Sequence, residues 1–273
     1  MGIAAEAMEN IECLKLRLRE IAIATLESPE HKKDFECLLN KFRLSREEII
    51  ETILKYTFAK EFSNEDYSSM NMRFVLYLHN VIPYSYHQQR QSLILSYLNI
   101  CRGSLIDIGF GVPQQYVFDL LENDKFNITL ADKDEAAIFF AKALFKTKNS
   151  RSNKIQYKLI DMNKELPGKY DTYLFLDSIE HIDDSRGYLK KTVELADKHS
   201  QFIFALPITD KDSKRGMHSI EWRTDSHALN WLQDCGLVIE EHKSIIPNKE
   251  VDFFAFIDGK RFHNLIVRCG KKN

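Results

Sequence analysis

The sequence lacks the features that mark membrane proteins, nucleic-acid-binding proteins and zinc proteins. No apolar run approaches the roughly 20 residues that a membrane-spanning helix needs. The net charge is −2, so no excess of positive charge draws the chain to nucleic acid or to an anionic membrane. The five cysteines are scattered and odd in number, and no pair has the spacing of a zinc site. We therefore expect buried, reduced thiols in a cytoplasmic protein.

The composition is that of an ordinary globular chain. Hydrophobic residues make up 44% and charged residues 29% of the 273 positions, which leaves room for a sizeable core. Residues 1–10 carry acidic side chains and no basic segment, so they do not resemble a secretory signal. A chain of this length allows one large domain, or one domain with a helical extension.

Glycine is absent between Gly2 and Gly103, and this absence favours continuous helix in the first part of the chain. Apolar residues recur there at intervals of three and four, which is the spacing of one helical face. Ser28, followed by proline, predicts a helix N-cap. Ser45 and Glu48 fit a capping box, in which each side chain bonds to the backbone N–H of the other residue.

After residue 103 the pattern changes to apolar strands that alternate with helices. The predicted strands are 104–108, 127–131, 155–160, 172–176, 201–206, 237–242 and 264–268. The predicted helices are 114–121, 135–146, 185–198 and 225–234. Such alternation predicts a mostly parallel sheet with helices on both faces. We expect two domains: a helical N-terminal cap or lid over residues 1–101, and an α/β domain over residues 102–273.

The C-terminal part of the sequence holds a hairpin signal. Asp258 and Gly259 predict a tight turn before the last strand. Residues 253–257 form either an additional strand or part of a loop. The sheet is therefore expected to end in an antiparallel strand.

The chain is organised around a strand, two glycines and a helix. The apolar strand that begins at Ser104 runs into Gly109 and Gly111, and a helical pattern follows. Glycines bring the backbone close to a ligand, and the helix N-terminus favours an anionic group. The run resembles the first motif of class I S-adenosylmethionine (SAM)-dependent methyltransferases, D-x-G-x-G-x-G. Asp107 and both glycines match, while Pro113 replaces the third glycine. The resemblance implies that the glycines approach the methionine part of SAM and that Asp107 supports the loop.

Acidic residues follow the next three predicted strands. They are Asp132, Asp161 with Met162, and Asp177 with Ser178. The carboxyl ends of parallel strands form the ligand-binding edge of such a sheet. Each acid alone is also typical of a solvated loop, but together they suit one adenosine-shaped ligand. The family resemblance implies that Asp132 holds the ribose, that Asp161 and Met162 meet the adenine, and that Asp177 and Ser178 line the methyl side.

Two later segments resemble the small-molecule members of the same family. The run from Tyr173 to Ile182 resembles their fourth-strand motif, which often ends in Glu-His. The segment His218–Trp222 and the later Cys235–Val238 resemble their fifth-strand loop and sixth strand. The resemblance covers residues 104–270 and implies a Rossmann-like sheet of seven strands.

Two histidines are candidates for a general base. They are His181 and His218. An unperturbed imidazole titrates near neutral pH, so either side chain could take a proton from a hydroxyl or amine acceptor. Each is also compatible with a packing role. Glu180 and Glu221 lie beside them in sequence, but no spacing requires a metal, and we expect none.

Aromatic residues crowd the segment between the helical part and the first strand. Pro83 interrupts the helical pattern, which predicts an extended piece holding Tyr84 and Tyr86. We expect the segment from Tyr77 to Tyr86 to close over SAM, with a ring facing the sulfonium. Core packing between helices is the alternative. Arg90, in the following helix, is expected to be exposed to solvent, with contact to the substrate as the alternative.

The sequence thus predicts a SAM-dependent methyltransferase acting on an O, N or C nucleophile of a small molecule. Two alternatives stay open: an enzyme that transfers or cyclises the aminobutyrate chain of SAM and releases methylthioadenosine, and a non-catalytic SAM-binding protein. The N/D-P-P-Y/F motif that the family uses on nucleic-acid amines is missing. We therefore expect neither a nucleic-acid nor a membrane partner. The acceptor and the oligomeric state are left open.

Overall fold

The computed structural model describes residues 2–58, 69–81, 85–122, 125–148, 152–209, 220–247 and 262–272. Its contacts divide the chain into two compact units, Met1–Ile82 and Pro83–Asn273, which are described separately. The helix α6 (Ser85–Leu98) belongs by its contacts to the second unit. The expectation that residues 1–101 act together as a cap stays a prediction.

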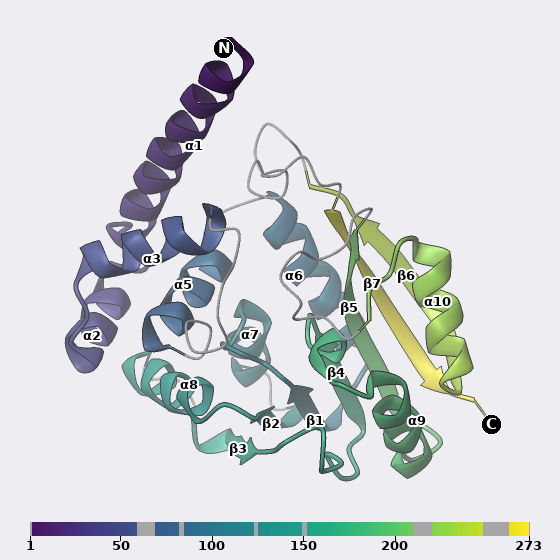
Figure 1. Cartoon of the computed structure of the whole chain (residues 1–273). Helices are drawn as coiled ribbons and strands as arrows, with labels where there is room; N and C mark the ends of the chain where they lie inside the picture. The colour runs from purple at the N-terminus through teal and green to yellow at the C-terminus, as the bar shows by residue number, and fades with distance from the viewer. Residues whose placement is uncertain are drawn as a thin grey trace. The chain divides into compact units, whose positions relative to one another are not determined.

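The first unit is helical, as expected (Figure 1). Its described helices are α1 (Gly2–Leu26), α2 (Lys32–Phe42), α3 (Arg46–Phe58) and α5 (Met70–Val81). Their apolar stripes pack together, and Leu18, Phe35, Ile53 and Phe74 are almost completely buried. No helix in the described part of the chain is both long and apolar enough to cross a membrane.

The predicted helix caps of this unit have mixed outcomes. The capping box is confirmed, because Ser45 N donates to Glu48 Oε2 over 2.7 Å and Glu48 N donates to Ser45 Oγ over 3.1 Å. The cap at Ser28 is wrong, since α2 begins at Lys32. The carbonyl of Ser28 instead accepts the N–H groups of His31 and Lys32 in a turn that precedes the helix.

The second unit contains the sheet. Its strands are β1 (Gly103–Ile108), β2 (Phe126–Asp132), β3 (Ile155–Leu159), β4 (Thr172–Leu176), β5 (Gln201–Thr209), β6 (Leu237–Ile245) and β7 (Phe262–Lys271). The spatial order is β3-β2-β1-β4-β5-β7-β6, and only β7 runs antiparallel to its neighbours. The Rossmann-like, mostly parallel sheet of seven strands is therefore confirmed. The order in which strands are added to the sheet reverses between the parallel neighbours β1 and β4, which is where ligands bind in open sheets of this kind.

Helices cover both faces of this sheet. They are α6, α7 (Gln115–Glu122), α8 (Glu135–Thr147), α9 (Ser185–Leu195) and α10 (Asp225–Asp234). Apolar residues of α6, α7 and α8 pack on one face, and those of α9 and α10 pack on the other. Short 3-10 turns lie at Ser152–Lys154 (η1) and Ile179–His181 (η2). The two apolar layers fix the sheet and hold the ends of its strands in place.

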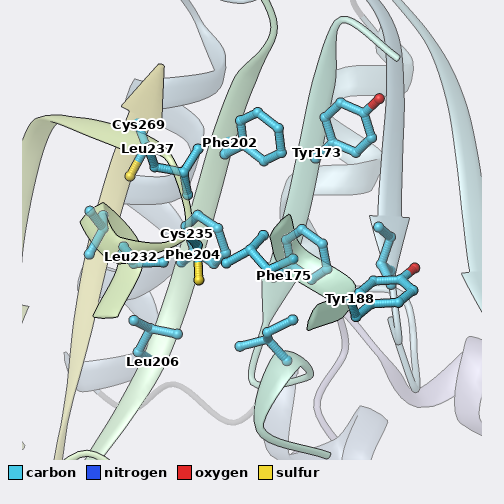
Figure 2. Close-up of a cluster of buried hydrophobic side chains, with 14 of the residues drawn as sticks. Tyr173, Phe175, Tyr188, Phe202, Phe204, Leu206, Leu232, Cys235, Leu237 and Cys269 are labelled. Carbon is cyan, nitrogen blue, oxygen red and sulfur yellow. The ribbon is translucent and has the colours of Figure 1, made fainter. Parts of the chain in front are cut away.

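Aromatic pairs bind β4 to β5 on the α9 and α10 face. Tyr173 stacks on Phe202 with ring centres 4.8 Å apart, and Phe175 stacks on Phe204 at 5.3 Å (Figure 2). Tyr188 of α9 meets Phe175 edge-on. Stacked rings bury large apolar areas, so the carboxyl end of β4 rests on a rigid core.

The structure adjusts several sequence expectations in detail. The strands β5, β6 and β7 are longer than predicted, because paired backbone groups continue beyond the apolar stretch that marked them. The five cysteines are free, but only three of them are buried; Cys13 and Cys37 are exposed on helix surfaces. The hairpin signal at Asp258 and the possible strand 253–257 lie outside the described residues.

Candidate functional site

The glycine loop joins β1 to α7 in the conformation that glycine permits. Gly109 and Gly111 have φ values of 69° and 59°. Gly109 N donates to the Ala131 carbonyl over 2.8 Å, which ties the loop to β2. A Cβ added at Gly109 would lie 2.7 Å from Ser178 Cβ, closer than such atoms approach. The close approach of the loop to Ser178, two residues after β4, therefore requires glycine.

Asp107 lies beneath this loop and is almost completely buried. Tyr116 of α7 donates its hydroxyl to Asp107 Oδ2, which joins the strand and the helix on either side of the loop. Burial raises the pKa of Asp107 to about 7, and this effect outweighs the hydrogen bond from Tyr116. The negative charge of Asp132 acts in the same direction as burial.

Asp132 ends β2 and is also buried. Its Oδ2 accepts the N–H of Gly111 over 2.9 Å, and its Oδ1 accepts the N–H of Asp134 over 2.9 Å. A carboxylate has about four acceptor positions, so one such side chain can accept from several donors at once. The same side chain thus shapes the glycine loop and presents acceptors at the edge of the sheet.

Asp161 and Met162 follow β3 and differ in environment. Asp161 Oδ2 is 2.7 Å from Lys164 Nζ, and Asp161 Oδ1 accepts the N–H of Asn163 over 3.1 Å. The hydrogen bond from Lys164 and the one from Asn163 hold the pKa of Asp161 below its ordinary value. Met162 is buried and lines a cavity of about 390 Å³.

This cavity extends away from the other predicted site residues. Its walls come from the segment after β3, the segment after β4 and the first turns of α9, and they include Leu166, Ile182, Tyr188 and Lys191. Of the residues expected to hold SAM, only Met162 contributes to it. The cavity is therefore adjacent to the predicted adenine position and separate from the glycine loop.

The end of β4 carries the strongest local electrostatics. Asp177 has a φ of 51°, an uncommon left-handed conformation for a residue other than glycine. Its Oδ2 lies 2.6 Å from Nη2 of Arg90, whose side chain is only 6% exposed. The expectation that Arg90 faces solvent is therefore wrong. Ser178 is buried beside Gly109.

Two further polar residues converge on this end of β4. Asn264 in β7 is buried and donates from Nδ2 to Asp177 Oδ1 over 3.5 Å. Glu180 is buried in η2, where burial and then the charge of Asp177 raise its pKa well above the ordinary value. His181 ends the same turn and is half-buried. Glu180, the base candidate His181 and Asn264 therefore lie near the end of β4, where the methyl side of SAM is predicted.

The remaining predicted residues are placed as follows. Tyr86 lies in the first turn of α6, buried beside His87 with ring centres 5.1 Å apart, so the expectation of an extended backbone there is wrong. Tyr77 packs on Phe35 in the core of the first unit. Tyr84 and His218 lie outside the described residues.

The sequence contains a local signal for the burial of Arg90. Arg90 shares one face of α6 with Tyr86, Ile94 and Leu98, all of which are buried. A charged side chain at the interval of four within an apolar stripe requires a buried partner. The partner itself, Asp177, is 87 residues away and is brought close only by the fold.

A second polar cluster was missed because its members come from three elements. Asp225 of α10 accepts the hydroxyl of Ser244 from β6, and its Oδ1 lies 2.6 Å from Nε2 of His263 in β7. Nothing in the sequence links these positions. Within the described ranges, no three His, Cys, Asp or Glu side chains are grouped so as to hold a metal ion.

Comparisons with known proteins bear on the fold. No family model matches the sequence, and no curated protein matches it. The solved N-methyltransferase NodS from Bradyrhizobium japonicum WM9, in complex with S-adenosyl-L-homocysteine (SAH), superposes with a TM-score of 0.51 at 14% identity, over 70% of this chain and 90% of NodS. The mitomycin 7-O-methyltransferase MmcR gives 0.54 at 14% identity, over 92% and 72%. The [4+2]-cyclase SpnF gives 0.54 at 10% identity, over 68% and 81%.

The fold is that of the class I methyltransferases. The structural neighbours include SAM-dependent methyltransferases of small molecules. At these identities the likeness establishes the architecture, and the chemistry has to be argued from the residues of this chain.

Proposed function

We propose that this chain is a SAM-dependent methyltransferase that acts on an O, N or C nucleophile of a small molecule. One observation carries the proposal: acids lie at or just beyond the carboxyl ends of β1, β2, β3 and β4, the edge of the sheet that also holds a glycine loop with two residues at positive φ. Structurally similar methyltransferases have been solved with SAM or SAH bound. This edge of the sheet suits such a ligand, which joins an adenosine to a charged amino-acid chain.

The residues present fit such a cofactor. Asp107 Oδ1 and Ser178 Oγ are buried and have no hydrogen-bond partner among the described residues. Buried polar atoms without partners are rare and indicate a missing one. In the proposal, Asp132 holds the ribose, Asp161 and Met162 meet the adenine, and Asp177 and Ser178 line the methyl side.

Bound SAM would supply a methyl group on a positively charged sulfur, which a nucleophile attacks in line. The protein would position the acceptor, exclude water and remove the proton of the nucleophile. His181 and His218 are the proposed bases, and the rings of Tyr84 and Tyr86 are proposed to face the positive charge. The proposal keeps the cytoplasmic location expected from free thiols.

The fold leaves a second candidate reaction. Because SpnF is a cyclase, this architecture supports reactions other than methyl transfer. The positive sulfur also activates the aminobutyrate carbons of SAM, so transfer or cyclisation of that chain is the alternative. A protein that binds SAM without reaction is the third candidate.

Product analysis separates the candidates. The protein is incubated with SAM and the small-molecule fraction of a cell extract, and the nucleoside products are identified by mass spectrometry. Release of SAH supports methyl transfer, whereas methylthioadenosine supports use of the aminobutyrate chain. SAM binding by calorimetry without any product supports the binding protein. Absence of both binding and products would contradict all three.

A further inference from the structure

Gln91 is a half-buried residue of α6 that bonds to the start of a different helix, α7. Its Nε2 donates to Gln114 Oε1 over 2.8 Å, and its Oε1 accepts the backbone N–H of Tyr116 over 3.4 Å. Gln114 directly precedes α7, and Tyr116 is the second residue of that helix. The side chain of Gln91 therefore bridges the residue before the helix and a backbone group of its first turn.

The bond to Tyr116 satisfies a group that the helix itself cannot satisfy. The first N–H groups of an α-helix have no acceptor within the helix, and the usual caps are Ser, Thr, Asp and Asn at the position before it. Gln114 stands at that position, and its side-chain oxygen accepts from Gln91. Pro113, one residue earlier, has no N–H group to bond. Gln91 thus caps α7 from 25 residues away in the chain.

This cap lies at the end of the glycine loop. The end of β2 holds the glycines of the loop through the bonds from Gly109 and Gly111 described above. Residues 112–114 then lead into α7, whose Tyr116 donates its hydroxyl to Asp107 beneath the loop. Because α6 binds the backbone N–H of the same tyrosine, it holds the α7 end of the loop.

We infer that Gln91 is a positioning residue: it holds the start of α7, and through it the glycine loop, in the conformation that binds the cofactor. The inference rests on the proposed function and adds a residue of α6 to the support of the loop. Apolar residues of α6 pack in one cluster with Phe110 and Tyr116, so packing of α6 brings Gln91 to its partners. Coupling between two sites is reciprocal, so a ligand at the loop should in turn stabilise α6 against local opening.

Calorimetry with SAH and methylthioadenosine tests the inference without any acceptor. Gln91→Met keeps the length of the side chain and removes both hydrogen bonds, so it should weaken SAH binding by about three- to tenfold. Gln91→Glu keeps an acceptor for the Tyr116 N–H, and the Gln114 amide can turn its NH2 group toward the carboxylate. This variant should therefore bind SAH within about twofold of the wild type. Methylthioadenosine lacks the chain that the loop is proposed to approach, so Gln91→Met should weaken its binding less.

Hydrogen exchange measures the same coupling along the backbone. Without ligand, the Tyr116 amide should exchange faster in Gln91→Met than in the wild type, because its acceptor is lost. SAH should slow exchange across α6 in the wild type more than in this variant. Gln89→Met is the matched control, since Gln89 lies exposed in the same helix and its replacement should change neither affinity nor exchange.

The outcomes separate a positioning role from a structural one. Equal losses for SAH and methylthioadenosine in Gln91→Met would show a general weakening of the fold and overturn the inference. Gln91→Glu binding as weakly as Gln91→Met would overturn it too, since the acceptor for Tyr116 would then not matter. A wild type that binds SAH, with a Gln91→Met variant that binds it equally well, refutes the inference alone. If the wild type binds neither ligand, the proposed function fails and the inference fails with it.

Discussion

Tyr116 donates its hydroxyl to the buried carboxyl group of Asp107 across the glycine loop that separates them in the chain. The bond joins the end of β1 to the first turn of α7, so the loop is held at both ends. Asp107 therefore supports the loop mechanically, besides any contact it makes with a ligand. Its second oxygen, Oδ1, has no partner in the described part of the chain.

The first prediction concerns pH. The pKa of Asp107 is about 7 in the folded chain, against about 4 when unfolded, so the folded state binds the proton more tightly. The free energy of unfolding should fall as pH rises from about 4 to about 7, by on the order of 4 kcal/mol from this group. Asp107→Asn should remove that part of the slope in urea unfolding series. Parallel curves for the variant and the wild type would contradict the prediction.

The second prediction concerns Gly109. Gly109→Ala combines positive φ with a Cβ 2.7 Å from Ser178 Cβ. Gly168→Ala is the matched control, since its φ is also positive but its nearest contact, on Tyr170, is 3.7 Å away. The Gly109 variant should lose about 1–3 kcal/mol more unfolding free energy than the control. Adding Ser178→Gly should recover part of that loss in denaturant titrations. Equal losses at Gly109 and Gly168 would refute the steric argument.

The fold was predictable because its signals are local. Apolar strands such as 172–176 stand between helices with clear caps and periodicity, and the structure places β4 at those same residues. The glycine loop was found for the same reason, as its two glycines lie between a strand and a helix. Errors appear where local rules compete, as at Ser28, which starts a turn four residues before the helix begins at Lys32.

The candidate site was predictable only in part. The acids after the strands could be listed in chain order, because parallel strands bring their carboxyl ends together. Their charge states could not be predicted, since the pairing of Asp161 with Lys164 and of Asp177 with Arg90 depends on side-chain positions. Asn264 was missed because a single amide in an apolar strand carries no motif.

The third prediction concerns Asp225, whose pKa shifts the other way. Burial raises the pKa of Asp225, but bonds with Ser244 and His263 outweigh it, so the pKa lies below the ordinary value. Asp225 therefore stabilises the fold above its unfolded pKa of about 4, and the stability is lost as pH falls through the lower folded value. Asp225→Asn should flatten this acid limb in unfolding series and lower stability at pH 7. Asp234→Asn, on the exposed end of α10, is the control and should change neither.

The last prediction ranks two acids at the proposed cofactor site. Asp132 is buried and directs both oxygens to backbone N–H groups, so its position is fixed before a ligand arrives. Asp161 is partly exposed, and Lys164 already occupies its carboxylate. Asp132→Ala should cost about 1.5–3 kcal/mol of SAH binding, the range for hydrogen bonds to a charged group. Asp161→Ala should cost less, because a ligand must compete there with the lysine and with water.

Calorimetry with SAH measures both variants, and circular dichroism checks that each is folded. Asp197→Ala, which removes an exposed partner of Lys169, is the control and should bind as the wild type does. Lys164→Ala should make Asp161 available and bring the effect of a further Asp161→Ala change closer to that of Asp132→Ala. Asp132→Ala with wild-type affinity would remove the ribose assignment. An Asp161 effect larger than that of Asp132 would mean that the adenine side, next to the cavity at Met162, dominates recognition.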